Sequence, residues 1–249
     1  MWNIANFLNS PSTGNDPYGA LYSGIQRANI VLRYIDQIPA SGITEEDRSM
    51  IKGEALFLRG YQYFLLVNNY KEVPLRLIPS NEDETNKGPA SEAALWTQVE
   101  EDLGNAIKCN LPVERTTAKE RVTKGAAIAM LGKVYATQHK YPEAKQLLVS
   151  LLSAPYSYEL VDDFAKNFTN EEEFNKESVY EIAYSPDGEY SWSNESGICL
   201  GCYIPQFIGP VKSGGWAKLM PNSFIVGEFT KETRPNGADT NFDKRIYAS

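Results

Sequence analysis

The chain has 249 residues, 42% hydrophobic and 22% charged, so it is long enough to bury a core and to form one or two domains. Its net charge is −8 at pH 7, and it contains no run rich in lysine or arginine. A nucleic-acid binder needs a basic face, so this class of protein is excluded. A neutral or polar small molecule, or a protein partner, fits the charge better.

Cysteine and histidine are too scarce for most metal, redox or triad chemistry. Three cysteines do not make a disulfide framework, and Cys199 and Cys202 lie among glycine and proline rather than at the start of a helix. A zinc site would need two more ligands, and only Cys109 and His139 are available. The sequence therefore favours a structural role for the two paired cysteines, and we expect no metal and no cofactor.

The first residues of the chain do not resemble a secretory signal peptide. Residues 1–6 have neither a charged n-region nor an apolar h-region. We therefore expect the chain to be cytoplasmic, to be a mature protein, or to be a fragment of a longer one.

Apolar residues with helical spacing predict a helix over about residues 21–35. The positions that share one face are Leu21, Ile25, Ala28, Leu32 and Ile35. Pro39 and Gly42 are expected to end this helix, because neither residue continues an α-helix well. Thr44, followed three residues later by Asp47, resembles a capping box and predicts the start of the next helix.

The second predicted helix contains the most apolar stretch of the chain, residues 55–67. This stretch is interrupted by Arg59 and is shorter than the roughly 18 apolar residues of a membrane-spanning helix. The polar residues of the helix form one narrow stripe, made of Arg48, Lys52, Arg59 and Gln62. A helix with so narrow a polar stripe must be covered on several sides. Glu54 lies off the stripe, and we expect it in an ion pair or a hydrogen bond to a neighbouring helix, because burying a lone carboxylate is costly.

The third predicted helix follows a loop over residues 79–90. Ser91 is expected to cap this helix, which runs to about Cys109 with Trp96 in the core or in a groove. Its apolar positions keep helical spacing and are Leu95, Val99, Leu103, Ala106 and Ile107.

Two further helices are predicted next. Thr117 with Glu120 resembles a second capping box and predicts a helix that runs to about Gln138. Pro142 at a first helical position predicts another helix, which ends near Ser153.

This last pair of helices matches the spacing of a tetratricopeptide repeat. The matching residues are Ile128, Leu131, Gly132, Tyr135 and Ala144, with isoleucine in the place of tryptophan. Gly132 is expected to let the partner helix approach closely. One repeat does not make a solenoid, but the helices upstream supply neighbours for it.

The character of the sequence changes after Pro155. Residues 178–184 alternate between apolar and polar side chains and predict a strand, with Tyr180, Ile182 and Tyr184 on one face. Residues 186–220 are rich in glycine, serine, proline and aromatic residues, which predicts long loops, where binding sites often lie. We therefore predict a mainly α protein. Residues 1–155 form a tetratricopeptide-like scaffold of helical pairs, and residues 156–249 form a loop-rich subdomain with a few short strands.

Six segments, in order along the chain, resemble the SusD/RagB-like nutrient-binding lipoproteins of the Gram-negative outer membrane. Residues 53–61, with Glu54 and Arg59, resemble that family's E-A-x-F-L-R-A-aromatic helix. Residues 70–75 resemble its aromatic-G-x-V-P-L exit, with Lys71 in place of glycine and with Pro74 as the proline. The other segments are residues 96–106, 121–127 and 177–182, and the stretch from Gly214, Gly215 and Trp216 through Pro221 to Asp243 and Arg245.

The resemblance implies a surface-exposed outer-membrane lipoprotein that captures a glycan or another nutrient and passes it to a SusC-like TonB-dependent transporter. It implies that the protein binds and does not cleave, and that Asp243 and Arg245 are structural. Family members are about twice as long and carry a signal peptide and a lipidated cysteine, neither of which is present in this chain. We therefore expect the chain to be the central part of such a protein, incomplete at the C-terminal end, with a lipid anchor elsewhere as its contact with the membrane.

Aromatic rings and amides in the loops are the candidate glycan contacts. Sugars stack their CH faces on aromatic rings and bond their hydroxyls to polar groups. Trp192 and Tyr190 are the first candidates for a stacking platform, with Asn194 as a hydroxyl partner, and Trp2 is a second candidate. Trp216 lies in the family-like segment, where packing is the expected role.

No catalytic constellation emerges from the sequence, because it has no G-x-S-x-G, P-loop or H-E-x-x-H motif. The acidic run at residues 171–173 is interpreted as a solvated surface turn. The leading hypothesis is a non-catalytic glycan-binding protein. The alternative is a tetratricopeptide-type scaffold whose groove binds a protein.

Overall fold

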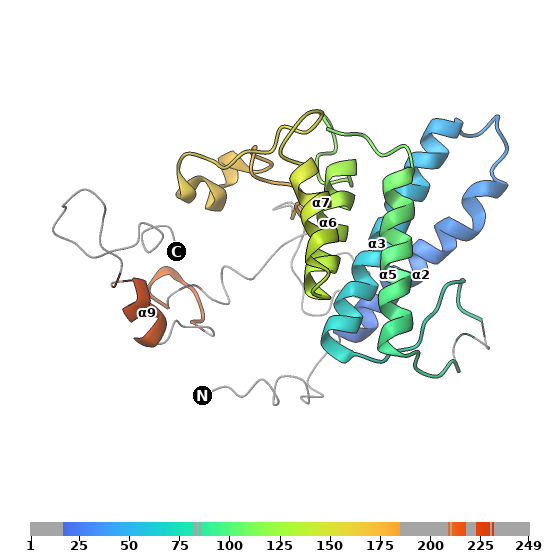
Figure 1. The fold of residues 1–249 in the computed structure, drawn as a ribbon, viewed down its shortest axis with the longest axis horizontal. Coiled ribbons are helices and arrows are strands. Elements are labelled where there is room, and N and C mark those ends of the chain that lie inside the picture. The colour runs from blue at the N-terminus through green and yellow to red at the C-terminus, as the bar shows by residue number, and fades with distance from the viewer. Residues whose placement is uncertain are drawn as a thin grey trace. The chain divides into compact units, whose positions relative to one another are not determined.

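The computed structural model describes residues 17–81, 84, 86–184, 209, 211–217, 223–229 and 231. Figure 1 shows that these residues are mainly helical, which confirms the predicted fold class. The chain divides into two compact units, Met1–Tyr158 and Glu159–Ser249. The helices of the first unit are α2 (Pro17–Tyr34), η1 (Ile35–Gln37), α3 (Glu45–Tyr70), α5 (Glu92–Lys108), α6 (Lys124–Thr137) and α7 (Tyr141–Ser150).

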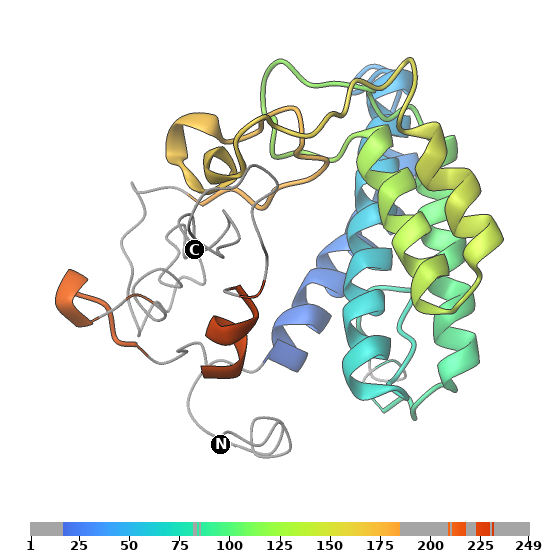
Figure 2. The same cartoon turned by 60° about the vertical axis from the view of Figure 1, so that its left-hand side comes forward.

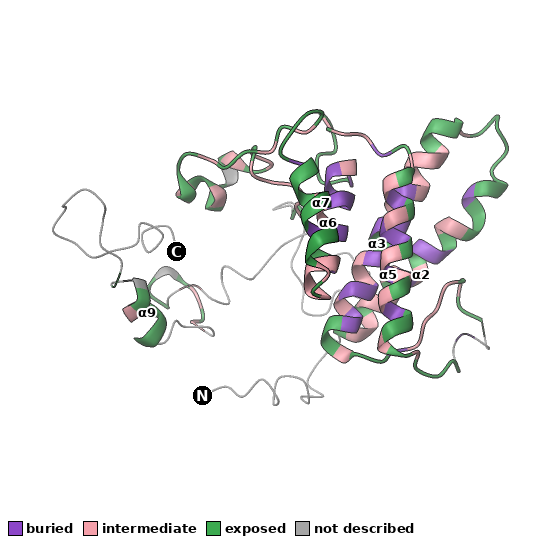
Figure 3. Cartoon of the chain, viewed as in Figure 1, coloured by how far each residue is buried: buried purple, intermediate pink, exposed green. Residues whose placement is uncertain are grey.

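The helices of the first unit pack one against the next in the order α2, α3, α5, α6 and α7. Helix α3 contacts α2 on one side and α5 on the other, α5 contacts α6, and α6 contacts α7. Figures 1 and 2 show this succession from two directions. Figure 3 shows that the buried positions of α3, α5 and α6 lie where these helices face one another. Across the described ranges, no helix has both the length and the apolar character needed to cross a bilayer.

Local signals in the sequence explain both ends of α3. The Thr44 side chain accepts a hydrogen bond from the Asp47 backbone N–H and donates one to the Asp47 carboxylate at 2.8 Å, so the predicted helix start at Thr44 is confirmed. At the other end, Lys71 has a φ of 66°, and the Glu72 N–H bonds to the Tyr70 carbonyl. This is a γ-turn of the rare, strained kind with positive φ, where glycine would be relaxed.

The core of the first unit contains a buried ion pair that the sequence pattern does not reveal. Arg59 belongs to the predicted polar stripe of α3, yet it is only 8% exposed. Its Nε and Nη2 atoms donate to the two carboxylate oxygens of Asp102 on α5, at 2.8 and 2.6 Å. Its Nη1 atom donates to Asn29 Oδ1 on α2 at 2.9 Å. One guanidinium therefore joins three helices.

The same polar cluster holds the segment that follows α3. The Asn29 amide donates to the carbonyls of Arg76 and Ile78, both at 3.1 Å. The Tyr63 hydroxyl donates to the Arg76 carbonyl and accepts from the Arg76 N–H, at 2.8 and 2.7 Å. Burial raises the pKa of Tyr63, so its hydroxyl keeps the proton that it donates. Residues 76–78 form no ladder, and side chains from α2 and α3 supply the partners that their backbone needs.

Glu54 is paired, as expected. Its carboxylate accepts from Arg115 and, at 2.7 Å, from Arg121. These arginines lie in the segment between α5 and α6 rather than on a neighbouring helix.

Helices α6 and α7 form the predicted tetratricopeptide-like hairpin. A Cβ atom added at Gly132 would lie 2.7 Å from Cδ2 of Leu148, so glycine permits the close approach of the two helices. Ala144 is buried against α6, and Tyr135 is half-buried with the Lys140 ammonium 5.6 Å from its ring centroid.

Two predicted helix boundaries in this unit are wrong. Helix α6 begins at Lys124 and not at Thr117, because Thr123 is the residue whose side chain caps it, through the Ala126 N–H. Ala118 takes a φ of 51°, which ends any helix begun at Thr117. Helix α7 ends at Ser150 rather than near Ser153.

The described part of the second unit consists of short helices joined by irregular backbone. The helices are η2 (Phe164–Phe168), η3 (Asn170–Glu172), η4 (Val211–Ser213) and α9 (Ser223–Phe229). The predicted strand at residues 178–184 is wrong, since no described residue pairs with it in a ladder. Ile182 and Tyr184, which the alternation places together on one face, are 57% and 51% exposed. An alternating pattern supports a strand only where a second strand can supply hydrogen bonds.

We predict that Arg59→Met lowers the free energy of unfolding by about 3–5 kcal/mol, because it leaves the Asp102 carboxylate buried without its charge partner. Urea unfolding followed by circular dichroism measures the change. The surface pair of Lys52 and Asp36, 2.7 Å apart, provides the control, and Lys52→Met should cost at most about 1 kcal/mol. The double variant Arg59→Met/Asp102→Leu should recover part of the loss. Equal losses for Arg59→Met and Lys52→Met would contradict the role given to the buried pair.

We predict that Gly132→Val destabilises the chain by about 1–3 kcal/mol, because the added carbons press against Leu148 on α7. Gly104 on α5 is a matched control, since a Cβ atom there meets nothing within 4 Å. Gly104→Val should leave stability unchanged or raise it slightly, because valine has a higher helix propensity than glycine. Thermal unfolding of both variants measures the difference. A Gly132→Val variant as stable as Gly104→Val would show that the exposed Leu148 side chain moves aside and that glycine is not required there.

Candidate functional site

The sequence-predicted glycan contacts lie outside the described residues. These are Trp2, Tyr190, Trp192 and Asn194. The same holds for Asp243 and Arg245 and for Cys199 and Cys202. The other named motif residues, Glu54, Arg59, Pro74, Gly132 and Tyr135, all lie in the helical unit, where they have packing and hydrogen-bonding roles. Pro74, for example, pairs with Pro89 in an isolated bridge and accepts from the Tyr22 hydroxyl at 2.6 Å.

The Gly-Gly-Trp segment of the second unit is a tight turn. Gly214 has a φ of 82°, which glycine adopts without strain. A Cβ atom on Gly215 would lie 2.1 Å from the Gly209 carbonyl oxygen, so this position also requires glycine. Trp216 follows directly and is 36% exposed, and the Ala217 N–H bonds to the Gly209 carbonyl at 2.9 Å.

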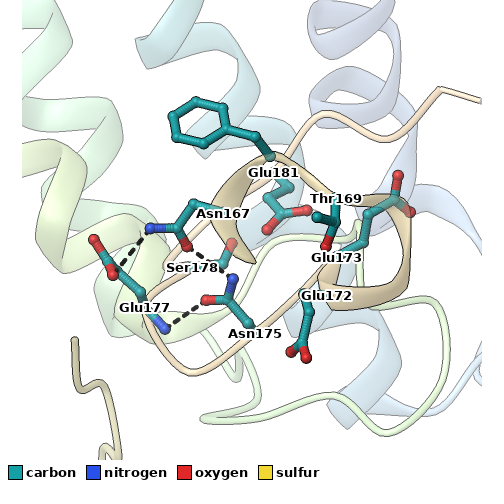
Figure 4. Close-up of a pocket in the computed structure, with 9 residues that line it drawn as sticks. Asn167, Thr169, Glu172, Glu173, Asn175, Glu177, Ser178 and Glu181 are labelled. Carbon is teal, nitrogen blue, oxygen red and sulfur yellow. Dashed lines mark hydrogen bonds between the residues drawn. The ribbon is translucent and has the colours of Figure 1, made fainter. Parts of the chain in front are cut away.

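A pocket of about 420 Å³ opens in the second unit, within residues 167–181. Its lining combines amides, hydroxyls, carboxylates and one aromatic ring. The lining residues are Asn167, Phe168, Thr169, Glu172, Glu173, Asn175, Glu177, Ser178 and Glu181. Figure 4 shows Asn167, Asn175 and Glu177 gathered on one side, with Glu172 and Glu173 on the other. Three of these nine residues, Asn167, Phe168 and Glu172, belong to the short helices η2 and η3.

Three of these residues form a closed ring of hydrogen bonds, drawn as dashed lines in Figure 4. The Glu177 backbone N–H donates to Asn175 Oδ1 at 2.8 Å, and Asn175 Nδ2 donates to Asn167 Oδ1 at 2.9 Å. Asn167 Nδ2 then donates to Glu177 Oε2 at 3.1 Å. Because an N–H can only donate and a carboxylate can only accept, the ring fixes the orientation of both amides.

The ring also fixes the charge of Glu177. Its carboxylate accepts from the Val161 backbone N–H and from the Asn167 amide, both at 3.1 Å. These bonds, the backbone one first, lower the pKa of Glu177 below that of an ordinary glutamate. Glu177 is therefore ionised at neutral pH. Glu181 likewise accepts from a backbone N–H, that of Phe174, at 3.1 Å.

The charge of the pocket is negative and only weakly compensated. Four of the nine described residues that line it are glutamates, and none of these nine is a lysine or an arginine. Glu172 pairs with Lys166 at 3.7 Å, and both of these side chains are well exposed. Among the described residues, no three acidic, histidine or cysteine side chains are arranged to hold a metal ion. The carboxylates are thus spread around the pocket rather than focused on one point.

Phe168 adds an apolar surface to this polar lining. It is 63% exposed and packs edge-on against Phe164, with ring centroids 5.1 Å apart. A ring held at one edge and open elsewhere can stack on the CH face of a sugar. The pocket can therefore offer both kinds of contact that a sugar needs, apolar stacking and hydrogen bonds to hydroxyls.

Sequence reasoning missed this pocket. It correctly placed residues 171–173 on the surface, but interpreted them only as a solvated turn. The available signal was the close spacing of Asn167, Asn175 and Glu177, polar residues that can satisfy irregular backbone. That spacing does not reveal which side chains close into a ring.

Comparison with known proteins places the chain in a family. A family model described as "Starch-binding associating with outer membrane" matches residues 2–136, and one described as "SusD family" matches residues 176–249. No curated protein matches the chain significantly.

Several solved structures share the fold. A laminarin-binding SusD-like protein is 34% identical, with a TM-score of 0.67 over 73% of this chain and 40% of its own. A SusD superfamily protein from Bacteroides vulgatus is 32% identical, with a TM-score of 0.76 over 92% of this chain and 46% of its own. The surface glycan-binding protein A from Bacteroides uniformis is 25% identical, with a TM-score of 0.60 over 68% of this chain and 38% of its own.

The chain thus spans less than half the length of these solved structures. One family model alone covers more than half of this chain, and a second covers its C-terminal part. The resemblance seen in the sequence motifs is therefore confirmed, and the chain belongs to the SusD family.

Proposed function

We propose that this chain is the glycan-binding part of a cell-surface protein that captures oligosaccharide and releases it unchanged. The observation that carries this proposal is the 34% identity to a laminarin-binding SusD-like protein over 73% of the chain. The similarity to a surface glycan-binding protein points the same way. The acidic net charge also suits a neutral ligand.

The proposal includes a partner and a location. A protein that collects sugar at the surface needs a route through the outer membrane, and we propose a SusC-like TonB-dependent transporter as its partner. The outer membrane appears in the description of the family that matches residues 2–136. We propose a lipid anchor elsewhere in the full protein as the attachment to that membrane.

Two regions of the second unit are proposed to contact the glycan. One is the loop with Tyr190, Trp192 and Asn194, chosen from its residue types, and Trp2 is a further candidate in the other unit. The other is the described pocket at residues 167–181.

The proposed role is binding without cleavage. A glycoside hydrolase needs a carboxyl group with a raised pKa that can act as the general acid. The hydrogen bonds of Glu177 lower its pKa instead. The bonds from Val161 and Asn167 would therefore have to be lost before this residue could serve as an acid.

A second candidate function is a scaffold that binds a protein through its tetratricopeptide-like helices. The observation in its favour is the apolar surface of α7, where Tyr141, Leu148 and Val149 are 61%, 40% and 52% exposed. Apolar side chains gathered on one helix are a common feature of protein-binding surfaces.

We predict that the chain is retarded in native gels that contain laminarin or soluble starch, and that it releases no reducing sugar from either. The control is a gel without polysaccharide, with bovine serum albumin as an unretarded reference. The neutral polymers match the pocket, whose free groups mostly accept hydrogen bonds from hydroxyls. Release of reducing sugar would contradict the non-catalytic role. Migration unchanged by every polysaccharide tested would favour the protein-binding alternative.

A further inference from the structure

We propose that the pocket at residues 167–181 is a glycan subsite that takes uncharged sugars and excludes acidic ones. This inference rests on the proposed glycan-binding function and adds to it the place and the chemical class of the ligand. It stands on three observations: a cavity of sugar size, fixed amides with spare bonding capacity, and an exposed aromatic residue in the same lining.

The cavity comes first, because a ligand site needs a concave surface. A volume of about 420 Å³ lies within the range of small-molecule pockets and has room for a monosaccharide or more. The described residues of its walls all come from one stretch of the chain, residues 167–181.

The ring of Asn167, Asn175 and Glu177 makes part of the wall rigid. Each amide uses one N–H and one oxygen lone pair within the ring, and each therefore keeps one N–H and one lone pair for another partner. Groups held in place by other bonds lose little freedom when a ligand arrives. Amide pairs of this kind match vicinal sugar hydroxyls, each of which both donates and accepts.

The carboxylates decide which sugars are accepted. Glu172, Glu173, Glu177 and Glu181 offer only acceptors when ionised, so they suit hydroxyl donors. A uronate or a sulfated sugar would bring an additional negative charge into a pocket whose described lining has four carboxylates and no cation. Because like charges repel more strongly where water is partly excluded, such a sugar should bind more weakly than its neutral counterpart.

Phe168 adds an apolar contact that a sugar can use and a purely polar ligand cannot. Phe168 belongs to the lining that contains the amides, and it is 63% exposed, although burial of an aromatic side chain is favourable. A sugar that stacks its CH face there would cover this apolar surface while its hydroxyls reach the amides and carboxylates.

The test uses the whole 249-residue chain and affinity gels with laminarin and soluble starch as neutral probes and polygalacturonate as the acidic probe. Phe168→Ala should weaken neutral binding about three- to tenfold, because one aromatic stacking contact is lost. Phe224→Ala is the matched control, since Phe224 on α9 is 68% exposed and does not line the pocket. It should bind as the parent does.

A charge reversal tests the exclusion of acidic sugars separately. Glu173→Lys should raise binding of polygalacturonate at least about threefold at low salt, where charges are weakly screened. Glu171→Lys changes the net charge equally in the same turn, but Glu171 does not line the pocket, so it should have a smaller effect. Both side chains lie at exposed positions, and neither substitution should impair folding.

Each outcome decides between the claims. Neutral binding that is the same in Phe168→Ala and in the parent overturns the subsite while the proposed function stands. Parent binding to polygalacturonate as tight as to the neutral glycans, or equal effects of Glu173→Lys and Glu171→Lys, overturns the charge exclusion. A parent chain that binds none of the probes refutes the proposed function itself, and the subsite with it.

Discussion

The buried pair of Arg59 and Asp102 sets the register of the helical unit. A guanidinium removed from water requires bonds for its N–H groups, and these come from Asp102, from Asn29 and, at 3.3 Å, from the Leu77 carbonyl. Gln98 adds a donor to the same carboxylate at 3.0 Å. A shift of α2 or α5 by one turn along α3 would leave a buried charge without its partner. The apolar contacts around the pair supply most of the attraction between the helices, but they are far less selective about register.

This constraint extends to the chain that leaves α3. Asn29 faces two ways, accepting from Arg59 and donating to the carbonyls of Arg76 and Ile78. The strained γ-turn at Lys71 is tolerated because the residues after it are fixed by Tyr63 and Asn29, while Val73 is buried. The helix, its exit and the following segment therefore depend on one connected set of hydrogen bonds.

The helices could be predicted from the sequence because their signals are local. Apolar spacing and the caps at Thr44 and Ser91 depend on residues within a few turns of one another. The box at Thr117 failed because a four-residue pattern contains no information about the backbone at Ala118. The strand at residues 178–184 failed because pairing depends on a second segment.

The partner of Arg59 lies 43 residues away in the sequence and on another helix, and no periodicity of α3 points to it. The pocket was missed for a similar reason, since its lining depends on how three short polar side chains close into a ring.

Polar groups in both units need hydrogen-bond partners, but these partners lie in the core of the helical unit and at the surface of the second unit. This difference affects where a ligand can bind. In the helical unit, glycines such as Gly132 bring helices together, and the donors of Arg59 are used inside the core. In the second unit, irregular backbone is stabilised by side chains at the surface, namely Asn175, Glu177 and Glu181. A carboxylate oxygen or amide that satisfies one backbone group still has capacity for another bond, and at the surface that capacity faces solvent. Loops stabilised in this way are therefore rigid and still able to bind, which is the combination that recognition of sugar hydroxyls requires.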